Sequence, residues 1–162
     1  MRGGAKIERR GVDTVYRQRM KSLKDIEITV GIHQGQQHDG LDIATYAAWN
    51  NFGTKNSQGE ELIPARPFMK FSSEEIAKWM KTEEYRGVIR QVMRGEIKSV
   101  AAAHFIGRRA SKIVSDTLKK SNLYVQNSAV TIAMKNKGGV NKKVLENSGY
   151  LFNAPTYRVR SR

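Results

Sequence analysis

The clearest pattern of hydrophobic and polar positions lies between residues 26 and 32. Four branched apolar residues alternate there with Glu27, Thr29 and Gly31. Side chains two positions apart point to the same face of a strand, so the alternation predicts a strand with one buried face. The apolar residues of this stretch are Ile26, Ile28, Val30 and Ile32.

Apolar residues at helical spacing occur on both sides of this strand. Upstream, they predict a helix over residues 12–23. Downstream, they predict a short helix that follows the N-cap Asp42 and ends at Gly53. The polar residues 33–40 between the strand and this short helix predict a hairpin or loop. The repeating positions are Val12, Val15, Tyr16, Met20 and Leu23 in the first helix, and Ile43, Tyr46, Ala47, Asn50 and Asn51 in the second.

The middle of the chain is mainly helical. Residues 68–71 predict a short strand, and a capping box of Ser72 and Glu75 predicts that a helix starts directly after it. Residues 85–120 predict a long helical segment in which Gly95 is the expected break. The expected core contacts of this segment are Ile89, Val92, Val100, Ala110, Ile113, Val114 and Leu118.

These elements together predict an α+β fold, in which a small, mostly antiparallel sheet packs against long helices. The expected strands are residues 26–32, 68–71 and 156–160. A length of 162 residues favours one domain over residues 12–162. The Gly-rich, basic residues 1–11 are expected to form a flexible arm in front of it.

The segment from Thr54 to Phe68 combines a polar loop with a base fixed by prolines. A turn-rich loop of this length inside a compact domain is more often functional than a mere connection. Pro64 and Pro67 fix two backbone angles and hold Arg66 between them, an arrangement that suits a directional ion pair with a carboxylate. We therefore predict an interaction loop whose residues are Thr54, Glu60, Glu61, Pro64, Arg66, Pro67 and Phe68, with Phe68 as its anchor in the core. The alternative is a rigid connector in which Arg66 is a solvated surface charge.

The net charge of +14 is distributed unevenly. Residues 25–85 contain 5 Lys/Arg and 10 Asp/Glu, a net charge of −5, whereas the rest of the chain is strongly basic. Such a distribution fits general binding to polyanions, and it equally fits complementarity between copies of the same chain. If the helix is continuous, one of its faces carries a basic row of Arg86, Arg90, Arg94 and Lys98. A row of this kind is usually solvated and sometimes binds phosphate or an acidic neighbour.

Catalytic chemistry is not indicated by the sequence. The chain contains no cysteine, which excludes disulfides, thiolate metal sites and a cysteine nucleophile. His33, His38 and Asp39 lie close in sequence, but nothing fixes their spacing, so a surface loop is a better interpretation than a metal or nuclease site. We expect no enzymatic activity, no catalytic residue, no metal and no cofactor. The absence of a long apolar run or a signal peptide predicts no membrane partner and folding in a cytoplasm.

Three separated blocks of the chain carry a family resemblance. The first contains Val30-Gly31-Ile32, Tyr46-Ala47, Phe52-Gly53-Thr54 and the Ile-Pro-Ala-Arg-Pro-Phe run that ends at Phe68; the later blocks contain Asn127, Thr131, Lys135, Leu145, Ser148, Gly149 and Leu151. In this order the blocks resemble the tail-completion, or neck, proteins of tailed bacteriophages, which include the minor-tail Z type. That family typically has Glu-Phe-Gly-Thr, and Asn51 replaces the Glu here.

The resemblance implies a structural virion protein at the neck or at the head-proximal end of the tail. It implies a homo-oligomeric ring, with six copies favoured and twelve as the alternative, that completes the tail and leaves a channel for double-stranded DNA. The implied partners are tail-tube, terminator or head-tail connector proteins, assembled in the host cytoplasm. The alternative is a nucleic-acid-binding module that acts through its basic arms and its basic helix face.

Overall fold

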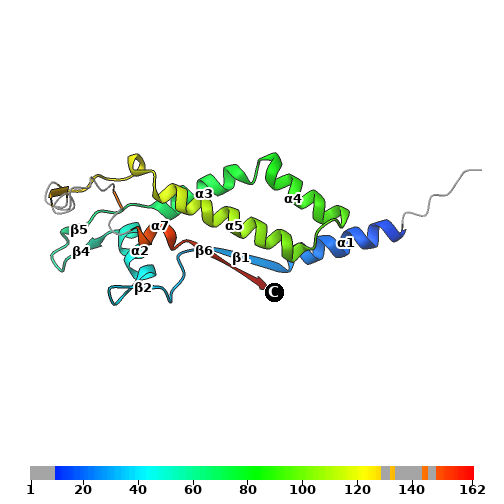
Figure 1. Ribbon diagram of the computed structural model, residues 1–162, viewed down its shortest axis with the longest axis horizontal. Coiled ribbons are helices and arrows are strands. Elements are labelled where there is room, and N and C mark those ends of the chain that lie inside the picture. The colour runs from blue at the N-terminus through cyan, green and yellow to red at the C-terminus, as the bar shows by residue number, and fades with distance from the viewer. Residues whose placement is uncertain (1–9, 129–131, 134–143, 146–148) are drawn as a thin grey trace, which may run out of the picture.

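The molecule is elongated, with its longest helices and its main sheet running along the long axis (Figure 1). The computed structural model describes residues 10–128, 132–133, 144–145 and 149–162. Its helices are α1 (Arg10–Lys24), α2 (Ile43–Phe52), α3 (Phe68–Trp79), α4 (Glu83–Arg94), α5 (Ser99–Leu118), the 3₁₀ turn η1 (Ser121–Leu123) and α7 (Tyr150–Asn153). Its strands are β1 (Ile26–Gly31), β2 (Gln37–His38), β3 (Leu41–Asp42), β4 (Thr54–Lys55), β5 (Glu61–Ile63) and β6 (Thr156–Ser161).

The main sheet joins the two strands that are furthest apart in the sequence. β1 pairs antiparallel with β6, from Ile26 opposite Ser161 to Gly31 opposite Thr156. Helix α5 packs on both strands and α3 packs on α5, so the sheet lies against helices as Figure 1 shows. The predicted α+β class and the strands expected over residues 26–32 and 156–160 are confirmed.

The strand expected over residues 68–71 is wrong, because these residues begin helix α3. Pro67 stands at the N-cap position but provides no side-chain cap. Asn51 takes that role from α2, since its Oδ1 accepts a 3.0 Å hydrogen bond from the backbone N–H of Met69. The prediction that a capping box of Ser72 and Glu75 starts a helix is also wrong, because Ser72 lies inside α3 and is fully buried. A four-residue stretch with three apolar residues fits either a strand or a helix, and the cap that decides between them lies outside the stretch.

The core forms two clusters. The larger lies between α2, α3, α5 and the C-terminal elements, and the smaller lies between α4 and the start of α5. Gly95 ends α4 in the left-handed conformation, so the predicted break is confirmed. Because this break resets the helical phase, Val100 faces solvent, contrary to the prediction, while Val88 is buried. The larger cluster comprises Ile43, Ala47, Phe68, Val114, Leu118, Tyr124, Val144, Leu145, Leu151, Phe152 and Ala154, and the smaller Val88, Val92 and Ala102.

The expected N-terminal arm lies mostly outside the described residues. Residues 10 and 11 belong to α1, so the helix begins two residues earlier than the spacing predicted. Thr131, Lys135 and Ser148, which carry part of the family resemblance, also lie outside the described residues. Within the described part, no helix combines the length and the apolar character that crossing a membrane requires.

His33 makes the stability of this fold dependent on pH. Its Nδ1 lies 2.8 Å from Thr156 Oγ1, which links the end of β1 to β6. Burial lowers the pKa of His33 below its ordinary value of 6.5, and the positive charges of Arg158 and Arg160 lower this pKa further. The unfolded chain therefore binds a proton that the folded protein does not, so His33 destabilises the fold as the pH falls through 6.5 toward its lowered pKa.

We predict that acidification from about pH 7.5 to about pH 5.5 lowers the Tm more in the wild type than in His33→Asn. Asparagine keeps a polar group near Thr156 but does not titrate. Thermal unfolding followed by circular dichroism at each pH measures the difference between the two proteins. Two parallel curves of Tm against pH would show that His33 keeps its ordinary pKa in the fold.

Candidate interaction site

Helix α2 positions the first part of the candidate site. Asp42 caps the helix: its Oδ1 accepts a 2.7 Å hydrogen bond from Ala44 N, and its Oδ2 accepts a 3.1 Å bond from Gly35 N. At the other end, Gly53 has a φ of 74°. A Cβ on Gly53 would lie 2.8 Å from Ile63 O and 2.9 Å from Ala65 N. Glycine is therefore required where the chain returns across the end of the helix, and both predicted ends of α2 are confirmed.

Residues 54–63 form a structured hairpin rather than an open loop. Strands β4 and β5 pair Thr54 with Ile63 and Lys55 with Glu61, with a bulge between them. Asn56 organises the tip, because its Oδ1 accepts hydrogen bonds from Gln58 N at 3.0 Å and from Glu60 N at 2.9 Å. Glu60 and Glu61 are exposed. The hairpin thus presents two carboxylates on a folded support.

Arg66 is buried and only 6% exposed, so the alternative of a solvated surface charge is wrong. Among the described residues its guanidinium has no carboxylate as a hydrogen-bond partner. Its guanidinium donates to three neutral oxygens: Nε to Val125 O at 3.1 Å, Nη1 to Asn50 Oδ1 at 3.4 Å and Nη2 to Asn127 Oδ1 at 3.3 Å. Its backbone N–H also donates to Asn50 O at 2.8 Å. Burial lowers the pKa of Arg66, while Tyr46 and Glu61 oppose this shift.

The prolines and Phe68 fix the base of the site from the other side. Pro64 and Pro67 flank Arg66 as the sequence indicated, and both are partly buried. Phe68 is almost fully buried in the larger core cluster, which confirms its predicted role as the anchor. Arg66 therefore joins α2 to the chain after η1, and Phe68 joins α3 to the core.

Sequence reasoning missed three large apolar side chains that are exposed on this rigid support. Phe52 at the end of α2 is 78% exposed, Leu62 on β5 is 64% exposed, and Trp49 lies one helical turn before Phe52 and is also exposed. We call these three residues and the adjoining hairpin tip the α2–hairpin face. A cavity of about 320 Å³ opens beside it, with Ala44, Ala48 and Phe52 in its lining. The available signal was the three-residue spacing of Trp49 and Phe52 on the face of α2 opposite Ala47 and Asn51.

The structure separates the members of the predicted basic row. Arg86, Arg90 and Arg94 are exposed on α4, but Lys98 lies beyond the Gly95 break and precedes α5. Arg90 pairs with Glu83, and Arg94 Nη1 lies 3.7 Å from Glu96 Oε1. The row is therefore shorter than predicted, and two of its members have acidic neighbours within the chain.

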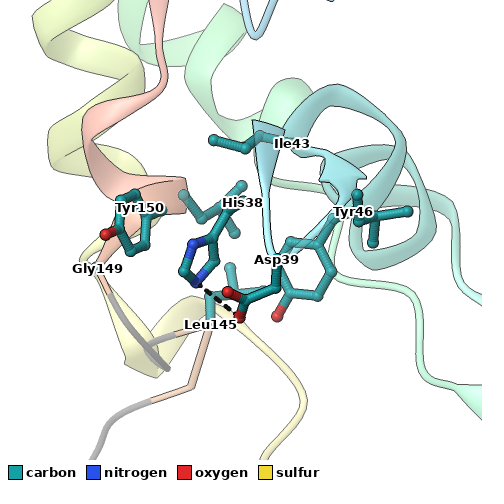
Figure 2. Close-up of a pocket in the computed structure, with 9 residues that line it drawn as sticks. His38, Asp39, Ile43, Tyr46, Leu145, Gly149 and Tyr150 are labelled. Carbon is teal, nitrogen blue, oxygen red and sulfur yellow. Dashed lines mark ion pairs between the residues drawn. The ribbon is translucent and has the colours of Figure 1, made fainter. Parts of the chain in front are cut away.

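A second cavity, of about 230 Å³, lies between the β2–β3 hairpin and α7 (Figure 2). The His38 ring stacks on Tyr150 with 3.8 Å between ring centroids, and His38 Nε2 lies 3.3 Å from Asp39 Oδ2. His33 is not part of this lining: it bonds to Thr156 of β6 and lines the cavity beside Phe52. Among the described residues no group of three or more His, Asp and Glu side chains is arranged to hold a metal ion.

Comparison with protein-family models, with curated proteins and with solved structures gave no match for this chain.

Proposed function

We propose that this protein is a structural component of a tailed-phage virion, located at the neck or at the head-proximal end of the tail. It assembles as a homo-oligomeric ring, with six copies favoured over twelve, that completes the tail, joins it to the head and leaves a channel for double-stranded DNA. The role involves no catalytic step and no cofactor. Its neighbours in the virion are tail-tube, terminator or head-tail connector proteins.

The observation that carries the proposal is the α2–hairpin face. Large apolar side chains that are exposed on a rigid support favour contact with another protein, because exposing them to water is unfavourable. Trp49, Phe52 and Leu62 are exposed within the segment where the family resemblance is densest. The glutamates at the hairpin tip give this face a charged rim, which is typical of protein interfaces.

The rigidity of the support favours the same role. Asn51, Gly53 and Arg66 connect α2, the hairpin and α3 through buried contacts. A surface that is already ordered loses little conformational entropy when a partner binds. A virion protein that must dock in one orientation benefits from such a preformed surface.

We predict that replacing residues 56–60 by the two-residue turn Asn-Gly spares folding but blocks assembly. The tip is exposed and polar, and Asn-Gly is a favoured turn between paired strands, so the Tm should change by no more than about 2 °C. Infectivity should fall by orders of magnitude when the variant complements a phage that lacks the gene. Gln58→Ala, which keeps the tip, is the control and should complement fully. Normal titres from the shortened hairpin would contradict an interaction role for its tip.

The nucleic-acid alternative has one specific observation in its favour. Arg158 and Arg160 are both exposed on β6, and their combined field reaches the His33 ring. A protein that binds through such charges should bind short duplex DNA as an isolated subunit, with an affinity that falls steeply as salt rises. Fluorescence anisotropy with a labelled duplex measures this binding. Strong binding at physiological salt, lost in Arg158→Ser/Arg160→Ser, would favour the alternative over the proposed virion role.

A further inference from the structure

Helix α1 projects from one end of the elongated molecule, and α2 and the β4–β5 hairpin, which carry the α2–hairpin face, lie toward the other end (Figure 1). The second half of α1 is fixed to the body: Arg19 Nη1 donates a 2.6 Å hydrogen bond to Met93 O, and Leu23 packs on the smaller core cluster. In the first half, Val15 is 44% exposed and Tyr16 is 53% exposed. The projecting half of α1 thus carries apolar side chains that the rest of the described chain does not cover.

Among the described residues, the segment that forms α1 and the segment around the α2–hairpin face have net charges of opposite sign. Residues 10–24 contain five Lys/Arg and one Asp, a net charge of +4. Residues 34–63 contain four Asp/Glu and one Lys, a net charge of −3. Arg17 and Lys21 are exposed on α1, and Glu60 and Glu61 are exposed beside Leu62. Opposite charges around apolar centres favour association in one orientation and oppose association of like ends.

We propose that α1 of one copy docks on the α2–hairpin face of a second copy. Val15 and Tyr16 pack against Phe52 and Leu62, and the cavity beside Phe52 receives the Tyr16 ring. Arg17 and Lys21 meet Glu60 and Glu61 at the edge of this contact. The inference rests on the self-assembly part of the proposed function and specifies its contact surfaces.

The occupant is a second copy because the chain's own α1 lies at the far end of the molecule (Figure 1). A contact between two different surfaces leaves one surface of each kind free at the ends of any open chain of subunits. Further subunits therefore add through the same contact, and the assembly either closes into a ring or continues as a filament. A contact of this type accounts for a ring without a further interface.

Two double variants test the contact, one altering the α1 surface and the other altering the α2–hairpin face. The helix variant carries Val15→Glu and Tyr16→Glu, and the face variant carries Phe52→Asp and Leu62→Asp; all four residues are exposed, so the fold is expected to persist. Val100→Glu, at an exposed valine of α5, is the control for adding charge to an apolar surface position. Circular dichroism melts check folding, and size-exclusion chromatography with light scattering at about 0.1 mM protein measures mass.

The wild type and the Val100→Glu control should form species above the monomer mass of 18.3 kDa. Each double variant alone should be monomeric. A 1:1 mixture should form a two-chain complex of twice the monomer mass, because the face variant supplies an intact α1 and the helix variant supplies an intact face. A monomeric wild type, variants that still assemble, or a mixture that stays monomeric would each overturn the proposal.

Charge reversal gives a second test that leaves the apolar residues unchanged. Glu60→Lys/Glu61→Lys and Arg17→Glu/Lys21→Glu should each weaken assembly of the protein alone at low salt. Their mixture should regain assemblies larger than two chains, because the α1 of each variant is opposite in charge to the face of the other. A mixture that does not recover would exclude the charge pairing.

Mass spectrometry of purified virions tests the proposed function separately. If the mixed variants assemble but virions lack the protein, only the virion role is refuted. If virions contain the protein but the mixed variants do not assemble, only this contact is refuted.

Discussion

Gly107→Ala is expected to destabilise the protein by about 2–3 kcal/mol, which corresponds to a fall in Tm of about 5–10 °C for a chain of this size. Tyr157 of β6 lies directly against the α5 backbone at Gly107. A Cβ added there would lie 2.6 Å from Tyr157 Cγ and 2.9 Å from Tyr157 Cε2, far closer than carbon atoms can pack. The helix and the main sheet would have to separate, and α5 is the helix that covers this sheet.

Gly87→Ala is the matched control, because Gly87 also lies inside a helix but has open space around it. The nearest atom to its added Cβ is Arg90 Nη2 at 3.9 Å. Alanine has the higher helix propensity, so Gly87→Ala should stabilise the protein by about 0.5–1 kcal/mol. The two substitutions are chemically identical and should act in opposite directions. Chemical denaturation measures both free energies of unfolding.

A double-variant cycle identifies the cause of the Gly107 effect. In a Tyr157→Ala background the ring that opposes the new methyl group is absent. Gly107→Ala should then be neutral or slightly stabilising, as at Gly87. If Gly107→Ala remained as damaging in that background, contact with Tyr157 would not be the reason for glycine at this position.

Arg66→Met is expected to lower the free energy of unfolding by about 2–3 kcal/mol. Methionine fills a similar volume but leaves Asn50 Oδ1, Val125 O and Asn127 Oδ1 without their donor. The Asn50 side chain is buried, so water does not readily replace that donor. Removing a buried charge returns some desolvation energy, which keeps the expected loss moderate.

Two further substitutions test this explanation. Arg66→Lys keeps the positive charge, but one ammonium group cannot reach three separate acceptors in the fork geometry of a guanidinium, so part of the loss should remain. Arg86→Met removes an exposed arginine of α4 and should change stability by less than about 0.5 kcal/mol. Urea denaturation compares the variants. Equal stability of Arg66→Met and the wild type would show that the three hydrogen bonds contribute little.

Much of this fold was present in local patterns of the sequence. Alternation predicted β1, helical spacing with Asp42 and Gly53 predicted α2, and Gly95 marked the end of α4. These features depend on residues within a few positions of one another, so periodicity, caps and backbone freedom are enough to identify them.

Tertiary structure alone decided the features that make this segment a candidate interaction site. The acceptors of Arg66 from Val125 and Asn127 lie 59 and 61 residues away, and Asn51 caps a helix 18 residues further on. The pattern of residues 68–71 could not distinguish a strand from the helix that this distant cap permits. Exposure of Phe52 and Leu62 likewise depends on which elements pack around them. Local sequence specifies which conformation each segment prefers, whereas burial, exposure and the partners of polar groups are set by residues that meet only after the chain folds.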